Sequence, residues 1–362
     1  MEHSSRVIAD RSGVGHSQEM PRVSIVIPCH NNAEHALECL ASVARMDYPN
    51  LEIIVVDDGS TDGTAERIAR SHPAVTVLRG DGNLWWAGAT NMGISEALRR
   101  GAEYVLLLNP DCVVAPDLAS RLISCARERP GAIIGPRTYD YDCPRQIWFT
   151  GGKIDWGNGG SLFIHPGEFA RNPADEPISV EWLHALGMLI SRPILEKVGL
   201  MEATHLPHYW ADCDFSLRVR QAGFEVLLEP RARLWNKVES SGITHERARM
   251  TWARWKVAFT SVKSNLEWRT TRFFFRRHCP RFYYHFALAR FYHRNVSALL
   301  RRSLESFVYS HPTLLFLARW LLGRPTRRSR TANRSTSATV APPEAARTGR
   351  LTDETCRRRR KA

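Results

Sequence analysis

The sequence predicts an α/β fold built around a mostly parallel sheet. Between residues 23 and 108, apolar runs rich in β-branched residues alternate with segments of helical spacing. Several of these runs end in loops rich in Asp, Asn and Gly. The chain has 362 residues, of which 43% are hydrophobic, so a large core can form. Ligands of open parallel sheets collect beyond the carboxyl ends of the strands, so these loops are the predicted position of a functional site.

The first half of the chain repeats a strand-then-helix pattern. A strand is expected at 23–28, a β-branched run that ends at a proline, and apolar residues follow at helical spacing over 33–43. A second buried strand at 51–56 runs into the turn-rich loop 57–64. The other elements expected in this half are a helix at 65–69, a strand at 75–78, a helix at about 90–100 and a strand at 104–108.

The second half is less periodic. Residues 137–185 are rich in Gly, Trp, Pro and Asp, which predicts loops and irregular strands that form a flap beside the functional site. A helix is expected to start near Ser191, because Pro193 suits a first turn in which its missing N–H has no intrahelical partner. The other elements expected here are a strand at 187–190, a helix that carries Asp212, Phe215 and Val219, a strand at 224–228 and a helical region over 252–322.

Four segments are predicted: a disordered N-terminus at 1–20, a catalytic unit at 21–250, a helical region at 251–323 and a basic disordered tail at 324–362. The helical region mixes aromatic and aliphatic residues with Arg, so it either lies in a membrane interface or packs on the catalytic unit. The net charge of +13 is concentrated in the tail, which is either simply solvated or attracted to an anionic membrane. Nucleic acid is not expected as a partner, because no zinc finger, RNP-type motif or basic-region heptad is present.

Cysteine usage and hydropathy predict a cytoplasmic protein on the inner face of the cell membrane. The eight cysteines are scattered without a C-x-x-C pair, which favours a reducing compartment. Residues 1–20 lack the apolar region of a secretory signal. The most apolar stretch, 313–322, is far shorter than the roughly 20 residues that span a bilayer. The association with the membrane is therefore expected to be peripheral.

Three acidic clusters lie where carboxylates can bind a ligand, hold a cation or act as a base. Asp58 follows a buried strand, where its carboxylate could accept hydrogen bonds from a base or a ribose, although Asp-Asp-Gly-Ser is also a common turn. Asp111 ends a buried strand in Asn-Pro-Asp, either as a simple turn or as the rigid ligand of a hard divalent cation. Asp212 opens a helix, either as a cap or as a general base. Asp214 and Arg218 stand four residues apart and are expected to pair on the helix surface.

The order of these clusters resembles that of the family 2 glycosyltransferases of the GT-A fold, in particular the bacterial rhamnosyltransferase-like members. The resemblance covers about residues 22–242 and implies a GT-A α/β domain, a mixed, mostly parallel sheet flanked by helices, followed by a C-terminal helical extension. The matching pieces are Val-Ser-Ile-Val-Ile-Pro-Cys-His-Asn at 23–31, the 57–64 loop, Gly-Asn-Leu-Trp-Trp-Ala-Gly-Ala-Thr-Asn-Met-Gly-Ile at 82–94, Asn-Pro-Asp at 109–111, and 209–223.

The resemblance also implies residue roles. Asp111 would bind a divalent cation, Mn²⁺ or Mg²⁺, and Asp212 would be the catalytic base of a single inverting displacement. The nucleotide and donor-binding residues would be Pro28, His30, Asn31, Asp58, Asn83, Gly88, Asn91, Asn109 and Gly187.

The chain departs from the family pattern at several of these positions. Asn109 stands in place of the usual first aspartate of the metal motif, and Ala211 in place of the glutamate before the base. Asn236 occupies a position where similar proteins often carry a metal-binding histidine, for which His245 is a candidate substitute. Two sets of residues keep open roles. Trp85 and Trp86 either stack on the donor or belong to the core, and the other set is Trp182, His184 and Met188.

The function expected from the resemblance is transfer of a sugar from a nucleotide-diphosphate donor, with dTDP-rhamnose favoured, to a hydroxyl of a glycan or polyprenyl-linked acceptor in bacterial cell-surface polysaccharide synthesis. The alternatives are a UDP- or GDP-hexose donor, or a GT-A-fold binding protein with weakened catalysis. A dinucleotide oxidoreductase is disfavoured, because residues 28–32 contain no glycine where a G-x-G-x-x-G turn would be needed. The sequence does not predict the oligomeric state.

Overall fold

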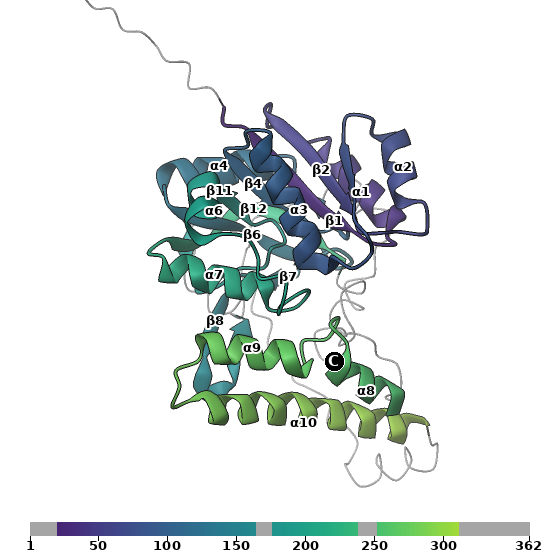
Figure 1. Cartoon of the computed structure of the whole chain (residues 1–362), viewed down its shortest axis with the longest axis vertical. Coiled ribbons are helices and arrows are strands. Elements are labelled where there is room, and N and C mark those ends of the chain that lie inside the picture. The colour runs from purple at the N-terminus through teal and green to yellow at the C-terminus, as the bar shows by residue number, and fades with distance from the viewer. Residues whose placement is uncertain (1–19, 164–175, 238–251, 311–362) are drawn as a thin grey trace, which may run out of the picture.

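A ten-stranded mixed sheet forms the centre of the molecule, in the order β10-β12-β6-β11-β4-β1-β2-β3, with β5 paired to β12 and β7 to β6. The structure is a computed structural model, and it describes residues 20–163, 176–237 and 252–310. Figure 1 shows helices on both faces of this sheet and a separate layer of helices beyond one end of its strands. The expected α/β class with a mixed, mostly parallel sheet is confirmed.

The parallel half of the sheet is formed by the first four strands. β1 (Val23–Cys29) is completely buried, and it pairs in parallel with β2 (Leu51–Asp57) on one side and β4 (Tyr104–Leu107) on the other. Burial on both faces suits its run of Val and Ile, which pack well on a pleated surface. The remaining elements of this half are α1 (Ala33–Val43), α2 (Thr64–Ser71), β3 (Thr76–Arg79) and α3 (Trp85–Arg99).

The other half is mixed. β11 (Leu189–Ser191) runs antiparallel between β4 and β6 (Ala132–Asp140), and β6 pairs in parallel with β12 (Glu225–Asn236) through a bulge between Glu229 and Arg233. The other elements of this half are β5 (Cys112–Val114), α4 (Leu118–Glu128), β7 (Ile147–Phe149), β10 (Ile178–Ser179), α6 (Arg192–Val198) and α7 (Ala211–Gln221).

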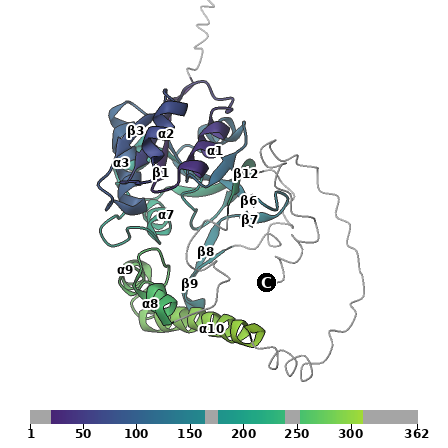
Figure 2. The same ribbon diagram turned by 90° about the vertical axis from the view of Figure 1, so that its right-hand side faces the viewer.

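A helical extension lies beyond the carboxyl ends of the strands. It consists of α8 (Trp252–Thr260), α9 (Trp268–His278) and α10 (Tyr284–Ser310). Figure 2 shows a hairpin of β8 (Gly152–Asp155) and β9 (Gly160–Phe163) reaching from the sheet towards α10, with the short helix η1 (Trp156–Asn158) between the two strands. A side chain at Gly159 would meet the backbone of Phe291 at 2.7 Å, so the hairpin tip packs directly on α10.

A buried ionic cluster joins the extension to the sheet domain. Asp214 of α7 is completely buried, and its carboxylate accepts hydrogen bonds of 2.8 Å from Arg218 Nε and from His278 Nε2 of α9. Arg277 Nε lies 3.4 Å from the same carboxylate. Burial raises the pKa of Asp214, but the hydrogen bond from His278 and the charge of Arg218 outweigh it and hold this pKa below its ordinary value. Next to this cluster, the rings of Trp210 and Phe274 stack with centroids 4.5 Å apart.

Several expectations need correction. α3 begins at Trp85, five residues before the expected start, because Asp58 binds the free backbone N–H groups at this end of the helix. The described residues of 137–185 form short strands separated by loops, as expected, whereas the last strand, expected at 224–228, continues to Asn236. The Asp214–Arg218 pair exists, but it is buried, since α9 covers it. Within the described ranges, no helix is both long and apolar enough to cross a bilayer, and the N-terminal 19 residues, the 313–322 stretch and the basic tail lie outside these ranges.

Candidate active site

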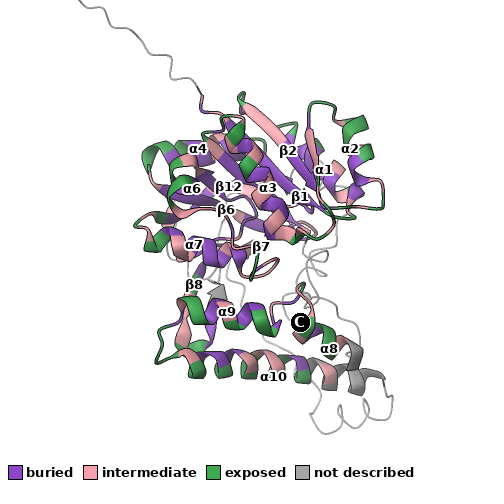
Figure 3. Ribbon diagram, in the orientation of Figure 1, coloured by how far each residue is buried: buried purple, intermediate pink, exposed green. Residues whose placement is uncertain are grey.

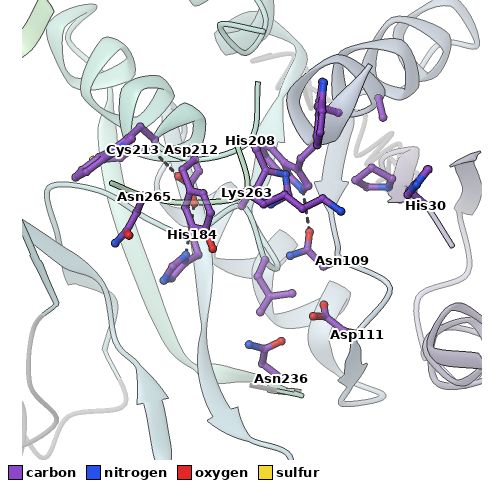
Figure 4. Close-up of a pocket in the computed structure, with 18 of the residues that line it drawn as sticks. His30, Asn109, Asp111, His184, His208, Asp212, Cys213, Asn236, Lys263 and Asn265 are labelled. Atoms are coloured by element: carbon purple, nitrogen blue, oxygen red, sulfur yellow. Dashed lines mark hydrogen bonds and ion pairs between the residues drawn. The ribbon is translucent and has the colours of Figure 1, made fainter. Parts of the chain in front are cut away.

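A cavity of about 810 Å³ opens at the carboxyl ends of the central strands. Asp58, Asp111 and Asp212 all line it, although they come from three distant parts of the chain. The wall opposite the sheet is formed by the helical extension, including residues of α10. Figure 4 shows Asp212 and His184 together in one part of the cavity and Asp111 with Asn236 in another. The three aspartates predicted for the nucleotide, the cation and the base therefore line one cavity.

Asp58 organises the loop that borders the nucleotide side. Its Oδ1 accepts hydrogen bonds from the backbone N–H groups of Gly82 at 2.9 Å and Leu84 at 3.3 Å, and its Oδ2 accepts one from Trp85 at 2.9 Å. A helix start leaves its first N–H groups without partners, and a carboxylate there satisfies them. Asp58 therefore fixes the loop and the start of α3, and a direct contact with the base or ribose stays a prediction.

Pro28 and His30 line the same side of the cavity. His30 Nδ1 lies 2.6 Å from the backbone carbonyl oxygen of Asp58, so the imidazole is tied to the second loop of the pocket. Asn31 is not among the lining residues. It adopts a positive φ of 49°, and its Oδ1 accepts a hydrogen bond of 2.8 Å from the Thr61 N–H. Asn31 thus joins the two loops instead of facing the cavity.

The 82–94 motif presents one face of α3 to the cavity through Trp85, Trp86 and Ala89. Trp85 is 38% exposed, whereas Trp86 packs partly against the core and donates a hydrogen bond of 3.0 Å from Nε1 to Asn109 Oδ1. Trp86 therefore belongs partly to the core, and stacking of either tryptophan on the donor stays a prediction.

Three residues expected on the donor side do not line the cavity: Asn83, Gly88 and Asn91. Asn83 is exposed, and Gly88 lies against Leu84 within its own helix. The Asn91 side chain bridges to the backbone of Met201, with both hydrogen bonds at 2.9 Å. Asn91 therefore attaches α3 to the loop before α7.

Gly187 also lies outside the lining. It has a φ of 86°, and an added Cβ would meet Pro136 Cγ at 2.4 Å. This position needs glycine for its left-handed backbone and for close packing against β6. The adjacent Ala185 and Leu186 are the residues of this segment that line the cavity.

Asp111 and Asn236 supply the oxygen atoms of a candidate cation site. Asn236 pairs with Cys112 in the antiparallel ladder of β12 and β5, and the Lys237 N–H donates to the Asp111 carbonyl at 2.9 Å, so the two side chains are neighbours. Asn236 Oδ1 is buried and has no hydrogen-bond partner within the described ranges. Carboxylate and amide oxygens suit Mg²⁺ or Mn²⁺. No group of three His, Cys, Asp or Glu side chains suitable for a metal occurs in the described part of the chain, so the remaining ligands would have to come from elsewhere.

Asp212 stands in the first turn of α7 with His184 beside it. The two are joined by a contact of 3.5 Å between His184 Nδ1 and Asp212 Oδ2, and the Cys213 N–H donates to Asp212 Oδ1 at 2.8 Å. Both side chains are about one quarter exposed, so the carboxylate is ordered by its neighbours yet open to a ligand. This geometry suits a general base.

Aromatic rings surround the Asp212–His184 pair. Trp148 stacks on His184 with centroids 5.1 Å apart, and the Trp182 ring lies edge-on to it at the same distance. On the other side, burial and the charge of Lys263 lower the pKa of His208 to about 4, although the charge of Asp212 opposes this shift. Tryptophan faces next to polar groups are suited to bind the apolar face of a sugar.

The helical extension contributes residues to the cavity that no sequence motif predicts. Lys263, Asn265 and Arg294 line the cavity, and they lie in a region without a recognisable motif. No local pattern distinguishes them, since Arg and Lys recur throughout this region. His245, the candidate substitute for a metal ligand, lies outside the described residues.

Comparison with known proteins identifies the family of the sheet domain. Residues 24–199 match the family described as "Glycosyl transferase family 2". The chain is 32% identical over 123 residues to the glycosyltransferase GlyG of Streptococcus pneumoniae serotype 4, which covers 33% of this chain and 40% of GlyG. It is 28% identical over 249 residues to the poly-beta-1,6-N-acetyl-D-glucosamine synthase of Staphylococcus epidermidis, which covers 66% of this chain and 55% of the synthase. The chain thus spans about half or less of the length of these relatives.

Among solved structures, the crystal structure of GalNAc-T7 with UDP, GalNAc and Mn²⁺ matches with a TM-score of 0.51 and 20% identity, over 60% of this chain and 44% of that one. At this identity the similarity concerns the fold, which is GT-A. Residues 24–199, which form most of the sheet domain, therefore belong to glycosyltransferase family 2.

Proposed function

We propose that the protein transfers a sugar from a nucleoside-diphosphate donor to a hydroxyl group of a glycan or polyprenyl-linked acceptor, with inversion at the anomeric carbon. The observation that carries this proposal is the meeting of Asp58, Asp111 and Asp212 around one cavity. The family of the sheet domain and the names of its relatives GlyG and the N-acetylglucosamine polymer synthase support the same reaction class.

In the proposed reaction, Asp212 accepts the proton of the acceptor hydroxyl. The hydroxyl oxygen forms a bond to the anomeric carbon while the bond from that carbon to the phosphate oxygen breaks, and the electron pair leaves with the nucleoside diphosphate. His184, 3.5 Å from Asp212, holds the carboxylate in place. One displacement from the face opposite the leaving group inverts the anomeric centre.

Asp111 and Asn236 are the residues that would hold Mn²⁺ or Mg²⁺, together with oxygen atoms of the diphosphate. When bound, the cation supplies positive charge that stabilises the leaving diphosphate. Since only one of the two protein ligands is charged, we expect weak cation binding in the absence of nucleotide. Asn109 is held by Trp86 through its Oδ1, so it is expected to shape the site instead of binding the cation.

For the donor, we favour dTDP-rhamnose, with a UDP- or GDP-hexose as the alternative. Pro28 and His30 would contact the nucleotide, and Asp58 would position the loop around it. Trp148, which stacks on His184 next to Asp212 and is only partly buried, would bind a sugar ring on the acceptor side, whereas Trp182 is buried in the core.

On the acceptor side, α10 carries a second cavity of about 380 Å³ that shares Arg294 and Ala298 with the first. Its lining contains the basic residues Arg290, His293, Arg294 and Arg301 and no Asp or Glu among the described side chains. A polyprenyl-linked acceptor carries phosphate, which arginine binds well. This favours an anionic acceptor whose hydroxyl reaches Asp212.

We also propose that α10 rests on the cytoplasmic face of the membrane. Phe286, His293 and Leu300 are spaced seven residues apart, which places them on one face of the helix, and Phe286 and Leu300 are at least half exposed. Figure 3 shows exposed residues recurring along the side of α10 that faces away from the sheet. The double variant Phe286→Ser/Leu300→Ser should sediment less with vesicles of anionic lipid than the wild type, whereas Phe273→Ser on α9 should not. Equal sedimentation of the double variant would contradict the membrane contact.

The function is tested with the full-length chain and a panel of nucleotide sugars that includes dTDP-rhamnose, UDP-hexoses and GDP-mannose. A donor should raise the melting temperature, and more so with Mn²⁺. Release of the nucleoside diphosphate should then depend on an added acceptor. Donor binding without any release, across the panel and with anionic acceptors, would favour the alternative of a binding protein with weakened catalysis.

A further inference from the structure

The charged residues of the main cavity divide by their origin in the chain. The three carboxylates Asp58, Asp111 and Asp212 come from the sheet domain. The Lys and Arg residues among the described lining, Lys263 and Arg294, come from the helical extension. The sheet domain therefore contributes negative charge to the lining of the cavity, and within the described ranges the extension contributes the Lys and Arg side chains of this lining.

We propose that Lys263 binds the diphosphate of the donor and stabilises its charge as it leaves, so that the extension completes the donor site. This inference rests on the proposed function. It adds a phosphate-binding residue that neither the motifs nor the family match contains.

The Lys263 ammonium lies in the middle of the cavity, next to Trp85 on the donor side. Its Nζ lies 5.9 Å from the ring centroid of Trp85, whose backbone N–H donates to Asp58. Figure 4 shows the Lys263 side chain in the middle of the cavity, between the part that holds Asp212 and the part that holds His30. No salt bridge joins Lys263 to any carboxylate of the described residues. Its charge is thus available to a ligand.

The backbone around Lys263 is firmly held. Ser264 and Leu266 are buried, and the Tyr292 hydroxyl of α10 donates to the Leu266 carbonyl at 3.3 Å. Glu267 caps α9 by accepting a hydrogen bond of 2.7 Å from the Thr270 N–H. Anchored residues on its C-terminal side direct Lys263 towards the cavity, while its own flexible side chain can adjust to a phosphate.

The proposed reaction would be favoured by the positive charge of Lys263 next to the donor diphosphate. As the anomeric bond breaks, negative charge grows on the diphosphate, and preformed positive groups in a cavity stabilise such charge strongly. The cation site offers one carboxylate, Asp111, and an amide, Asn236, so the metal alone is weakly held. In this proposal, Lys263 and the metal ion together stabilise the negative charge of the leaving diphosphate.

Binding measurements on the full-length chain test this role. The probes are UDP, GDP and dTDP and the matching nucleosides, each titrated by calorimetry at fixed Mn²⁺. Lys263→Gln should weaken binding of the preferred nucleoside diphosphate by about 10-fold or more, equal to about 1.4 kcal/mol. The affinity for the nucleoside should stay within about 2-fold, an effect of roughly 0.4 kcal/mol. Lys263→Arg should restore most of the diphosphate affinity. Lys256→Gln, which removes a lysine of α8 that does not line the cavity, is the matched control.

The outcomes separate this inference from the proposed function. If the wild type binds a nucleoside diphosphate and Lys263→Gln binds it equally well, the role of Lys263 is wrong and the function stands. If Lys263→Gln weakens nucleoside and diphosphate equally, the lysine supports the Trp85 region and does not bind phosphate, which also contradicts the inference. If the wild type binds none of the three nucleoside diphosphates, both proposals fail.

Discussion

The strand-end loops of the parallel half and the helical extension form the two sides of the same cavity, but they are built in different ways. In the parallel half, functional side chains follow directly from buried strands: Asp58 comes one residue after β2 and Asp111 four residues after β4. In the extension, Lys263 and Arg294 belong to a turn and to a long helix whose positions depend on packing. The first side is fixed by local sequence, whereas the second is fixed by contacts with α7 and the β8–β9 hairpin.

Substitution of Asp212 is expected to have the largest effect on the rate of transfer. Asp212→Asn should lower transfer by up to about 10⁴-fold while donor affinity stays nearly unchanged, because the amide cannot accept the proton. Nucleoside diphosphate release under saturating donor, compared with calorimetric donor affinity, measures both quantities. A variant that keeps wild-type turnover would remove Asp212 from the role of base.

The attachment of the extension gives the next effect. Asp214→Asn should destabilise the protein by about 3–5 kcal/mol, because it leaves the charge of Arg218 buried without its partner. Urea unfolding followed by circular dichroism gives this value. Glu196→Gln, which affects an exposed ion pair on α6, serves as the control and should change stability by less than about 1 kcal/mol. Equal stabilities of the two variants would mean that the extension is not held by this cluster.

On the side of the strand ends, Asp111→Ala should weaken donor binding in Mn²⁺ by about 100-fold, or about 2.8 kcal/mol. In a chelator the variant and the wild type should bind the donor alike, since the cation is then absent from both. An undiminished response to Mn²⁺ in the variant would refute the assignment of Asp111 as a cation ligand.

A smaller effect is expected from His208, which lies between the two sides with Lys263 and Asp212 as its charged neighbours. Its pKa is lowered to about 4 in the folded protein, mainly by burial, whereas an unfolded histidine titrates near 6.5. Between these values the unfolded chain binds the proton more readily, so stability falls as the pH falls from about 6.5 to about 4. At pH 5 the free energy of unfolding should be about 2 kcal/mol lower than at neutral pH because of this histidine. His208→Gln should lose less stability than the wild type between pH 7 and pH 5 in urea titrations; identical losses would contradict the shift.

The contrast between the two sides also explains what could be predicted from the sequence. The runs at 23–28, 51–56 and 104–108 became β1, β2 and β4 because their composition leaves little alternative to a buried parallel strand. The acidic residues at their ends followed with them into one cavity. Trp85 could not be recognised as the start of α3, since Asp58 creates that start from 27 residues away.

Other features depend on partners that no local pattern reveals. The spacing of Asp214 and Arg218 predicts an exposed ion pair on one helix, but α9 covers Asp214 in the folded protein. His184 is placed at the site only through its tertiary contact with Asp212. Gly187 resembles a ligand-binding glycine in sequence, but its conformation serves packing against Pro136. No sequence motif marks Lys263, because it is one of many basic residues in its region and only the fold places it at the cavity.

The joint between α7 and α9 has a consequence for how this protein can be altered. Asp212 and Asp214 are two residues apart on α7, so the helix that presents the candidate base is also the helix on which the extension is seated. Grafting a different C-terminal region onto this domain would therefore demand matching changes in α7, above all a partner for the Asp214 carboxylate. A chimera that exchanges acceptor preference between relatives should therefore fold only when α7 and the helices after it are transferred together.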